Sequence, residues 1–379
     1  MKNRLVFVDL LRGWATIVMI EVHVSNAFLL PDIKSAGWFG WVNFINGLVA
    51  PSFLFVAGFV FVVASDRKLE EFRRYGKAFW RQLSRIMLIW VIGYGLHLPY
   101  FSLTRTLRDS TPEQLLLFSQ SDILHCIAIG MLIVFIGRIV IKSDRSYQIF
   151  LACVGGAVVL LAPFIWEIDF SRSLPFVVAP YMNDHQGSIF PIFPWLGFLM
   201  FGALTAFAHK NMRAAGREKE YFVRLAAVGA VIIILGSLFV DLPSHIPGMS
   251  TAIRCNPMFF ASRLGIVFLL LVLCRLYAEW RKTEQSFVLD VSKESLMVYT
   301  AHLLVIYGRF WQGASPAFYY GGTFSLVLAS VATLVLVAVM VLLAKVWGTI
   351  KQKSIRSARV ISYATGIIVL ALFVVRVYG

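Results

Sequence analysis

The residues best suited to chemistry in this chain are two ionisable side chains inside its first long apolar stretch. Arg12 and His23 interrupt the segment from Leu5 to Leu30, which is otherwise composed to lie in lipid. An ionisable side chain near the bilayer centre costs roughly 2.5 to 3.5 kcal/mol, so by default it faces the protein interior and marks function. Histidine titrates near neutral pH, which suits a general base.

The spacing places both side chains on one side of a helix. Eleven positions separate Arg12 from His23, and at about 100° per residue that is about three turns. Asp9, Thr16 and Met19 fall on the same stripe. The sequence therefore predicts a polar stripe that faces protein instead of lipid.

Further polar groups lie in later apolar segments. Asp122 and His125 are i,i+3 neighbours, a spacing at which a carboxylate can orient an imidazole. Arg263, Tyr299 and His302 follow in two later segments. Each of these groups also has a purely structural interpretation, as a polar side chain that hydrogen-bonds across helices for folding alone.

The composition identifies the setting as a membrane. The chain has 379 residues, of which 59% are hydrophobic, 15% aromatic and 15% charged, with a mean hydropathy of +0.77. Soluble domains are only about 45 to 50% apolar. The net charge of +15 lies in short loops between apolar runs, so we expect no nucleic-acid partner.

Apolar runs long enough to cross a bilayer divide the whole chain. We predict an all-α, polytopic membrane helix bundle with about eleven transmembrane helices, forming a single domain over residues 1–379. The predicted spans are 5–30, 42–65, 81–102, 121–141, 146–166, 189–209, 222–240, 257–279, 291–312, 321–345 and 359–378.

Loop charges predict the orientation. Basic residues gather in alternate loops, as in the run from Arg67 to Arg85, whereas the other loops hold mostly acids. By the positive-inside rule the N-terminus is cytoplasmic and an odd span count leaves the C-terminus outside. Arg12 then lies in the inner half, while His23, Asp122 and His125 lie near the outer boundary. We expect these three to meet there, in a protein of the bacterial inner (plasma) membrane.

The four cysteines add no further site. Three fall within predicted spans and Cys255 stands alone, so neither a disulfide framework nor metal-ligand spacing is present. The sequence contains no Walker loop, dinucleotide fingerprint, HExxH or GxSxG. We expect no bound metal and no bound cofactor.

Five short motifs resemble one enzyme family. The opening resembles that of the transmembrane acyltransferases, in which an arginine and a histidine with ten residues between them mark the first helix; the closest similarity is to the family of the heparan-alpha-glucosaminide N-acetyltransferase catalytic domain. The motifs span residues 4 to 303 and are Arg4–Gly13 followed by His23, Ala50–Gly58, Asp122–Ala128, Phe193–Gly197 and Ser295–Leu303.

The resemblance implies a membrane acyltransferase. Such an enzyme takes an acyl group, usually acetyl, from cytoplasmic acyl-CoA as donor substrate and delivers it to a hydroxyl or amine of a glycan or sugar acceptor on the other side. The first outer loop here is short, so the glucosamine acceptor is not carried over. Glucan succinyltransferases share a similar first helix, and self-association into a homo-oligomer stays open.

Residue roles follow from this resemblance. We predict His23 as general base or transient acyl carrier, with Asp122 and His125 as its catalytic support. Arg12, Arg263, Tyr299 and His302 are predicted to bind acyl-CoA or the acceptor. The rise from Arg12 to His23, roughly 16 Å, is similar to the length of an extended pantetheine arm.

Two other functions remain open. A multi-span transporter or flippase of a small polar or lipid-linked substrate also places ionisable residues at mid-membrane, but it commonly shows paired broken helices in two halves, and this sequence shows none. A structural membrane subunit leaves the cost of Arg12 and His23 unexplained unless each is paired within the bundle.

Overall fold

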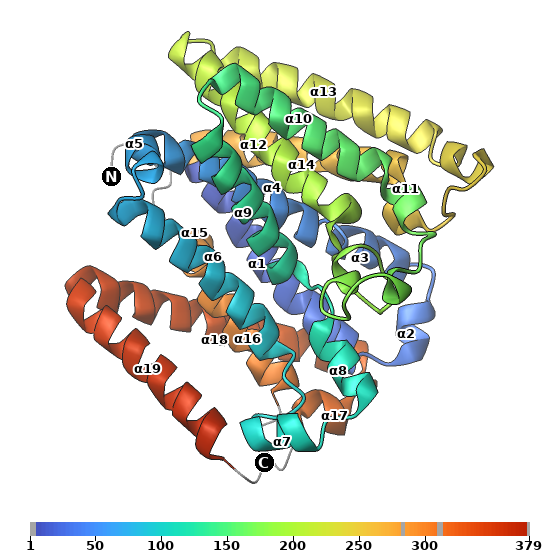
Figure 1. Ribbon diagram of the computed structural model, residues 1–379, viewed down its shortest axis with the longest axis vertical. Coiled ribbons are helices and arrows are strands. Elements are labelled where there is room, and N and C mark those ends of the chain that lie inside the picture. Colours follow the sequence, from blue (N-terminus) through green and yellow to red (C-terminus); the bar gives the residue numbers. More distant parts are fainter. Residues whose placement is uncertain (1–4, 282–284, 309–313, 377–379) are drawn as a thin grey trace. The chain divides into compact units, whose positions relative to one another are not determined.

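The computed structural model describes residues 5–281, 285–308 and 314–376 (Figure 1). Within these residues the secondary structure is helical, with no strand and a single isolated β-bridge between Leu29 and Phe324. This confirms the predicted all-α class. All seven predicted site residues lie in the described part of the chain.

The longer helices match the predicted apolar segments. They are α1 (Val6–Phe28), α4 (Val49–Ser65), α6 (Lys77–Leu96), α9 (Ile123–Val140), α10 (Asp144–Leu160), α12 (Ile192–Ala214), α13 (Glu218–Leu238), α14 (Pro257–Arg281), α16 (Ser295–Tyr307), α18 (Leu326–Lys353) and α19 (Ile355–Val375).

Shorter helices occupy the connections. The α-helical ones are α2 (Pro31–Ser35), α3 (Phe39–Asn46), α5 (Leu69–Arg73), α7 (Leu103–Arg108), α8 (Pro112–Ser119), α11 (Ala162–Ile165), α15 (Phe287–Lys293) and α17 (Pro316–Tyr320), and the 3₁₀ turns are η1 (Asp66–Lys68), η2 (Phe170–Arg172), η3 (Ala179–Tyr181), η4 (Leu242–His245) and η5 (Ile253–Cys255).

The chain forms two compact units that are interleaved in sequence. Unit 1 comprises residues 1–49, 95–118 and 278–379, and unit 2 comprises residues 50–94 and 119–277. The prediction of a single catalytic domain over the whole chain stays a prediction.

Unit 1 is built around α1. This helix packs against α15, α16 and α18, because its apolar residues recur at helical spacing and give it a face to bury. The cluster in its centre is fully apolar and consists of Ile20, Val24, Phe28, Val291, Val298, Ile306, Met340 and Ala344.

Unit 2 is built around α12, which packs against α9, α10 and α13. Two glycines allow α4 to approach α12 closely. A Cβ at Gly58 would overlap the carbonyl oxygen of Leu199, and one at Gly202 would overlap that of Phe55. Small residues at such crossings are typical of helix packing in membranes.

Seven described helical segments are long and apolar enough to cross a bilayer. They are Phe39–Arg73, Ile123–Val140, Ile192–Ala214, Glu218–His245, Pro257–Arg281, Leu326–Lys353 and Ile355–Val375. The other four predicted spans correspond to α1, α6, α10 and the broken pair α15 and α16. The predicted count of about eleven is therefore not confirmed, because polar residues or short length set these five helices apart.

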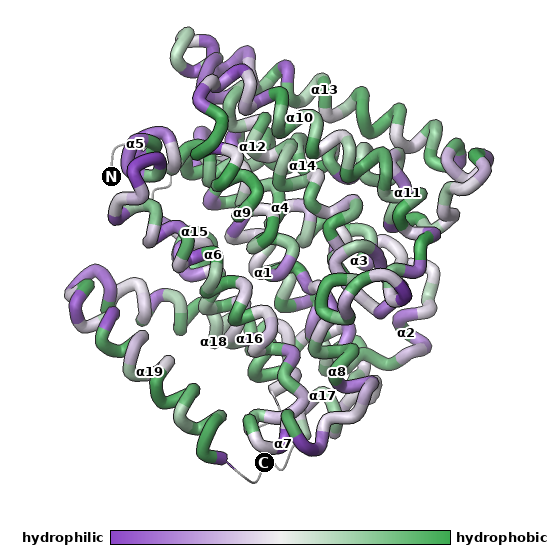
Figure 2. Tube along the Cα trace, viewed as in Figure 1, coloured by the Kyte–Doolittle hydropathy of each residue, from purple (hydrophilic) through white to green (hydrophobic). Residues whose placement is uncertain are grey.

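The exposed surfaces of the apolar helices indicate lipid contact. In α18 and α19 only 17% and 6% of the most apolar window is buried, and the hydropathy colouring shows apolar segments along α19 (Figure 2). Side chains such as Leu334 in α18 and Leu370 in α19 are more than half exposed. Water would penalise so much contiguous apolar surface, so these helices identify an integral membrane protein.

Candidate active site

In unit 1 the structure pairs His23 with His302. Nδ1 of His23 lies 2.9 Å from Nε2 of His302, across the contact between α1 and α16. His302 is completely buried, whereas His23 is partly exposed. The inner imidazole therefore supports the outer one.

Hydrogen-bond chemistry fixes the tautomers of this pair in its neutral form. Nδ1 of His302 lies 2.7 Å from the carbonyl oxygen of Val298, and because a carbonyl only accepts, that nitrogen carries the proton. Nε2 of His302 then accepts, so Nδ1 of His23 must donate to it. The lone pair of His23 is left on Nε2, which is the form a general base requires.

Two tyrosines flank the histidine pair. The Tyr299 ring lies edge-on to His302, and the Tyr307 ring lies edge-on to His23. The Tyr307 hydroxyl also lies 3.4 Å from the backbone oxygen of His23. The predicted residue Tyr299 is thus part of the packing around His302, and Tyr307 is an addition that sequence reasoning missed.

Arg12 is paired within unit 1. Its Nη2 donates to Oδ1 of Asp9 at 2.8 Å, and its Nε donates to Oγ of Ser292 in α15 at 3.0 Å. Thr16, on the same stripe, donates to the Arg12 carbonyl. Asp9 neutralises the charge of Arg12, and Asp9 and Ser292 both accept hydrogen bonds from its guanidinium. These contacts within the protein stabilise Arg12 in an apolar helix. The cost of its charge alone therefore no longer argues for a ligand.

In unit 2 the structure confirms the predicted contact between Asp122 and His125. Asp122 is the N-cap of α9 and accepts from the backbone N–H of His125 at 3.0 Å. Its Oδ1 also lies 2.7 Å from Nδ1 of the His125 ring. The backbone N–H of Asp122 approaches the same ring nitrogen at 3.2 Å.

These two contacts to the His125 ring require different tautomers. A carboxylate oxygen at 2.7 Å needs a proton on Nδ1, whereas the backbone N–H needs a lone pair there. The shorter, charge-assisted contact is the stronger, so we assign the proton to Nδ1. Asp122 therefore orients the imidazole as the spacing predicts.

Aromatic side chains and one glycine enclose His125. The Tyr94 and His125 ring centroids lie 4.2 Å apart, and Tyr94 and Trp90 both hydrogen-bond the Tyr181 hydroxyl, at 2.8 and 3.0 Å. A Cβ at Gly93 would lie only 2.9 Å from the ring atoms of His125. Only glycine allows α6 to pack this closely on the imidazole.

Burial keeps the Tyr181 phenol neutral. Its pKa is raised above the ordinary value chiefly by burial and then by the hydrogen bond with Tyr94. A phenol with a raised pKa stays protonated through the physiological range. Tyr181 lies in a connecting segment with no motif around it, so the sequence carried no signal for its position.

Arg263 belongs to α14, where it is buried and its guanidinium lies over the Phe259 ring. The seven predicted residues thus form two sets. Arg12, His23, Tyr299 and His302 belong to unit 1, and Asp122, His125 and Arg263 belong to unit 2. The expected meeting of His23 with Asp122 and His125 stays a prediction.

Among the described residues, no three histidine, cysteine, aspartate or glutamate side chains gather as metal ligands would. The two sites are instead built from imidazoles, tyrosines and single carboxylates. Together with the exposed apolar helices, these sites define the class of this protein as an integral membrane protein with buried acid–base groups.

The comparison with protein families identifies which membrane protein family this is. The family described as "Heparan-alpha-glucosaminide N-acetyltransferase, catalytic" matches residues 4–238. The match covers more than half of the chain, so this protein belongs to that family, and the resemblance seen in the motifs is confirmed. A search of curated proteins gave no match.

The matched range includes four of the five motifs and stops before the fifth. His23, Asp122 and His125 lie inside residues 4–238, whereas Arg263, Tyr299 and His302 lie outside. His302 nevertheless contacts His23 directly. The structure therefore links a residue beyond the family match to the first helix of the family.

Proposed function

We propose that this protein is a membrane acetyltransferase that uses acetyl-CoA from the cytoplasm and acetylates a hydroxyl or amine of a sugar-containing acceptor outside it. Family membership supports an acetyltransferase. The donor, the acceptor class and the sidedness are our proposal, and they follow from the family resemblance and the loop charges.

The observation that carries the proposal is the hydrogen bond between His23 and His302. With His302 anchored on the Val298 carbonyl, His23 presents Nε2 as a base. His23 is the partly exposed member of the pair, so substrate contact falls to it. His302, predicted as a binding residue, acts instead as a positioning residue behind it.

The proposed reaction is a direct transfer. Nε2 of His23 takes the proton from the acceptor hydroxyl or amine as that atom attacks the thioester carbonyl carbon. A new C–O or C–N bond forms, the C–S bond breaks, and the proton passes from His23 to the departing CoA sulfur. Atoms and charge balance without a further reactant.

The remaining predicted residues keep their roles in the proposal. Arg12 and Arg263 bind the donor or the acceptor, Tyr299 packs behind the histidine pair, and Asp122 orients His125 as a second acid–base group. Each unit is tested by its own variant, because the proposal does not depend on a contact between the two sets.

The test measures CoA release and acetyl transfer by the purified protein in detergent. Acetyl-CoA is the donor, with glucosamine as an amine probe and methyl glucoside as a hydroxyl probe. We expect turnover with one of them, and His23→Ala should lower kcat by about 10²- to 10⁴-fold, the usual contribution of a general base.

His245→Ala is the matched control, since it removes an exposed histidine from the η4 turn. It should keep wild-type turnover. Folded wild-type protein without turnover of acetyl-CoA toward either probe, or a folded His23→Ala variant with full activity, would contradict the proposal. A burst of CoA without acceptor that is lost in His23→Ala would identify His23 as an acyl carrier instead.

A further inference from the structure

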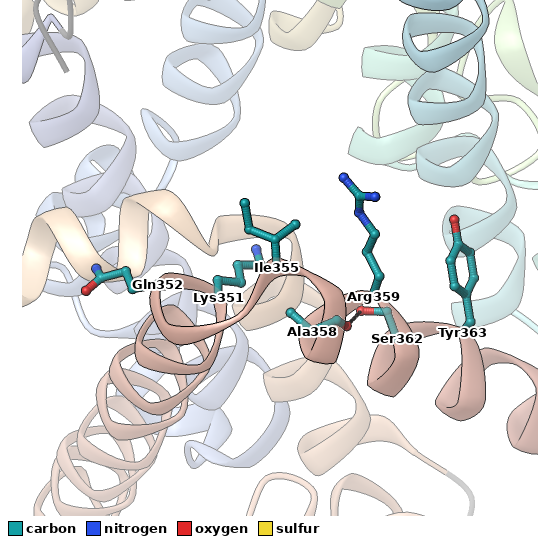
Figure 3. A pocket seen from close by; sticks show the side chains of 7 residues that line it. All are labelled: Lys351, Gln352, Ile355, Ala358, Arg359, Ser362 and Tyr363. Carbon is teal, nitrogen blue, oxygen red and sulfur yellow. Dashed lines mark hydrogen bonds between the residues drawn. The ribbon is translucent and has the colours of Figure 1, made fainter.

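A cavity of about 520 Å³ lies at the elbow between α18 and α19, within unit 1 (Figure 3). α18 ends at Lys353, a single extended residue follows, and α19 begins at Ile355. Ser354 caps α19 by accepting from the backbone N–H of Ser357 at 3.1 Å. The elbow is therefore a one-residue turn, stabilised by the Ser354 cap, between two long apolar helices.

The polar lining of this cavity suits an anion. Lys351 and Gln352 come from α18, and Arg359, Ser362 and Tyr363 come from α19. Arg359 and Tyr363 are one helical turn apart and project to the same side of α19 (Figure 3). Together these residues offer two cationic groups, the Tyr363 hydroxyl and an amide, whereas the Ser362 hydroxyl donates to the Ala358 carbonyl at 2.9 Å.

Only one of the two cations is neutralised by the protein. Lys351 donates to the Glu294 carboxylate at 2.6 Å. Arg359 makes no hydrogen bond or ion pair with any residue in the described part of the chain. No acidic residue occurs after Glu294 in the sequence. The elbow thus keeps a net positive charge beside the cavity.

The surroundings of the cavity are apolar. Ile355 lines it and is 64% exposed, and most side chains of α19 beyond Tyr363 are exposed aliphatic ones, such as Ile367 and Leu370. Basic clusters directly beside membrane helices attract anionic lipid. A ligand seated here meets cations at one end and a lipid-facing helix at the other, which favours an amphiphile over a soluble anion.

We propose that the α18–α19 elbow binds the phosphate of an anionic phospholipid headgroup. Arg359 contacts the phosphate, the Tyr363 hydroxyl donates to one of its oxygens, and the acyl chains lie along α19. The site is distinct from the histidine pair and does not depend on the proposed acetyl transfer.

The test uses the full chain purified in neutral detergent and counts bound lipid by native mass spectrometry. Phosphatidylglycerol is titrated against phosphatidylcholine for wild type, Arg359→Gln and the matched control Arg356→Gln, which removes a neighbouring arginine outside the cavity. We expect wild type to prefer phosphatidylglycerol. Arg359→Gln should weaken that binding about fivefold, and Arg356→Gln should not.

Two further arms make the result decisive. Tyr363→Phe, at an exposed position, should weaken phosphatidylglycerol binding in the same direction if Arg359→Gln fails to fold. Coenzyme A and inorganic phosphate are added as competitors and should leave the bound lipid in place. Displacement by either, equal effects of both arginine variants, or no preference for phosphatidylglycerol would overturn the proposal.

Discussion

At the scale of single residues, the site is defined by which ring nitrogen carries the proton. The Val298 carbonyl fixes His302, and His302 fixes His23. A neutral imidazole without such an anchor interconverts between tautomers, and only one of them has its lone pair on Nε2. The backbone of α16 thus selects the tautomer of a side chain on α1.

A glycine provides the residue-scale test for the second group. We expect Gly93→Ala to lower activity if Asp122 and His125 take part in the reaction, because the added methyl overlaps the imidazole and displaces it. Gly95→Ala is the control, since a Cβ there meets nothing within 4 Å. Acetyl-transfer kcat for the two variants, compared at equal folded fraction, gives the answer. Equal rates would leave His125 a purely structural residue.

The two histidine contacts differ in how far the sequence predicted them. Asp122 and His125 are three residues apart on one helix turn, so their contact followed from local geometry and is confirmed. His23 and His302 are 279 positions apart. Nothing in the spacing of one chain segment specifies such a contact, because it depends on how α1 and α16 pack.

Arg12 is paired inside the protein, so its position in an apolar helix does not by itself indicate a ligand. The expense of a charge in an apolar helix pointed to function, but Asp9 and Ser292 account for it. Asp9 was visible on the same stripe in the sequence, whereas Ser292 was not. For Arg12, a role in binding acyl-CoA now rests on the family resemblance.

At the scale of helices, close crossings decide the packing of unit 2. Gly202 faces the backbone of α4, while Gly156 in α10 faces open space. Alanine is the better helix former by about 1 kcal/mol, so the same substitution should have opposite effects at the two positions. Gly156→Ala should raise the free energy of unfolding, and Gly202→Ala should lower it by about 1 to 3 kcal/mol through overpacking.

Thermal unfolding in detergent, followed by tryptophan fluorescence or by aggregation, compares these two variants with the wild type. A stabilised Gly202→Ala protein would show that α4 and α12 do not cross as closely as described. The hydrophobic pattern of the sequence predicted both helices. It did not indicate which glycine lies at the crossing, because both positions are glycines within apolar segments.

At the scale of the whole molecule, the open quantity is the number of membrane crossings. Eleven apolar segments were expected and all contain helix, but seven meet the length and hydropathy expected of a span among the described residues. The other four carry polar groups or are short. Two of them, α1 and α16, hold the histidine pair: α1 carries charged residues, and α16 is apolar but only 13 residues long.

Cysteine labelling tests the topology directly. On the basis of the loop charges, single cysteines introduced at Arg67 and at Asp169 should react with an impermeant maleimide from opposite faces, the first from inside and the second from outside. Intact spheroplasts and inverted vesicles give the two sides. Labelling of both positions from one face would contradict the predicted alternation and the cytoplasmic N-terminus.

The measurement that tests the central claim most directly is a double-mutant cycle on acetyl-transfer kcat with His23→Gln and His302→Leu. Loss of the positioning hydrogen bond should cost about 5- to 150-fold in His302→Leu, and loss of the base should cost more in His23→Gln. Because His302 acts only through His23, the double variant should be no slower than His23→Gln alone. A double variant slower by the product of the two factors, or a folded His302→Leu protein with full activity, would contradict the account.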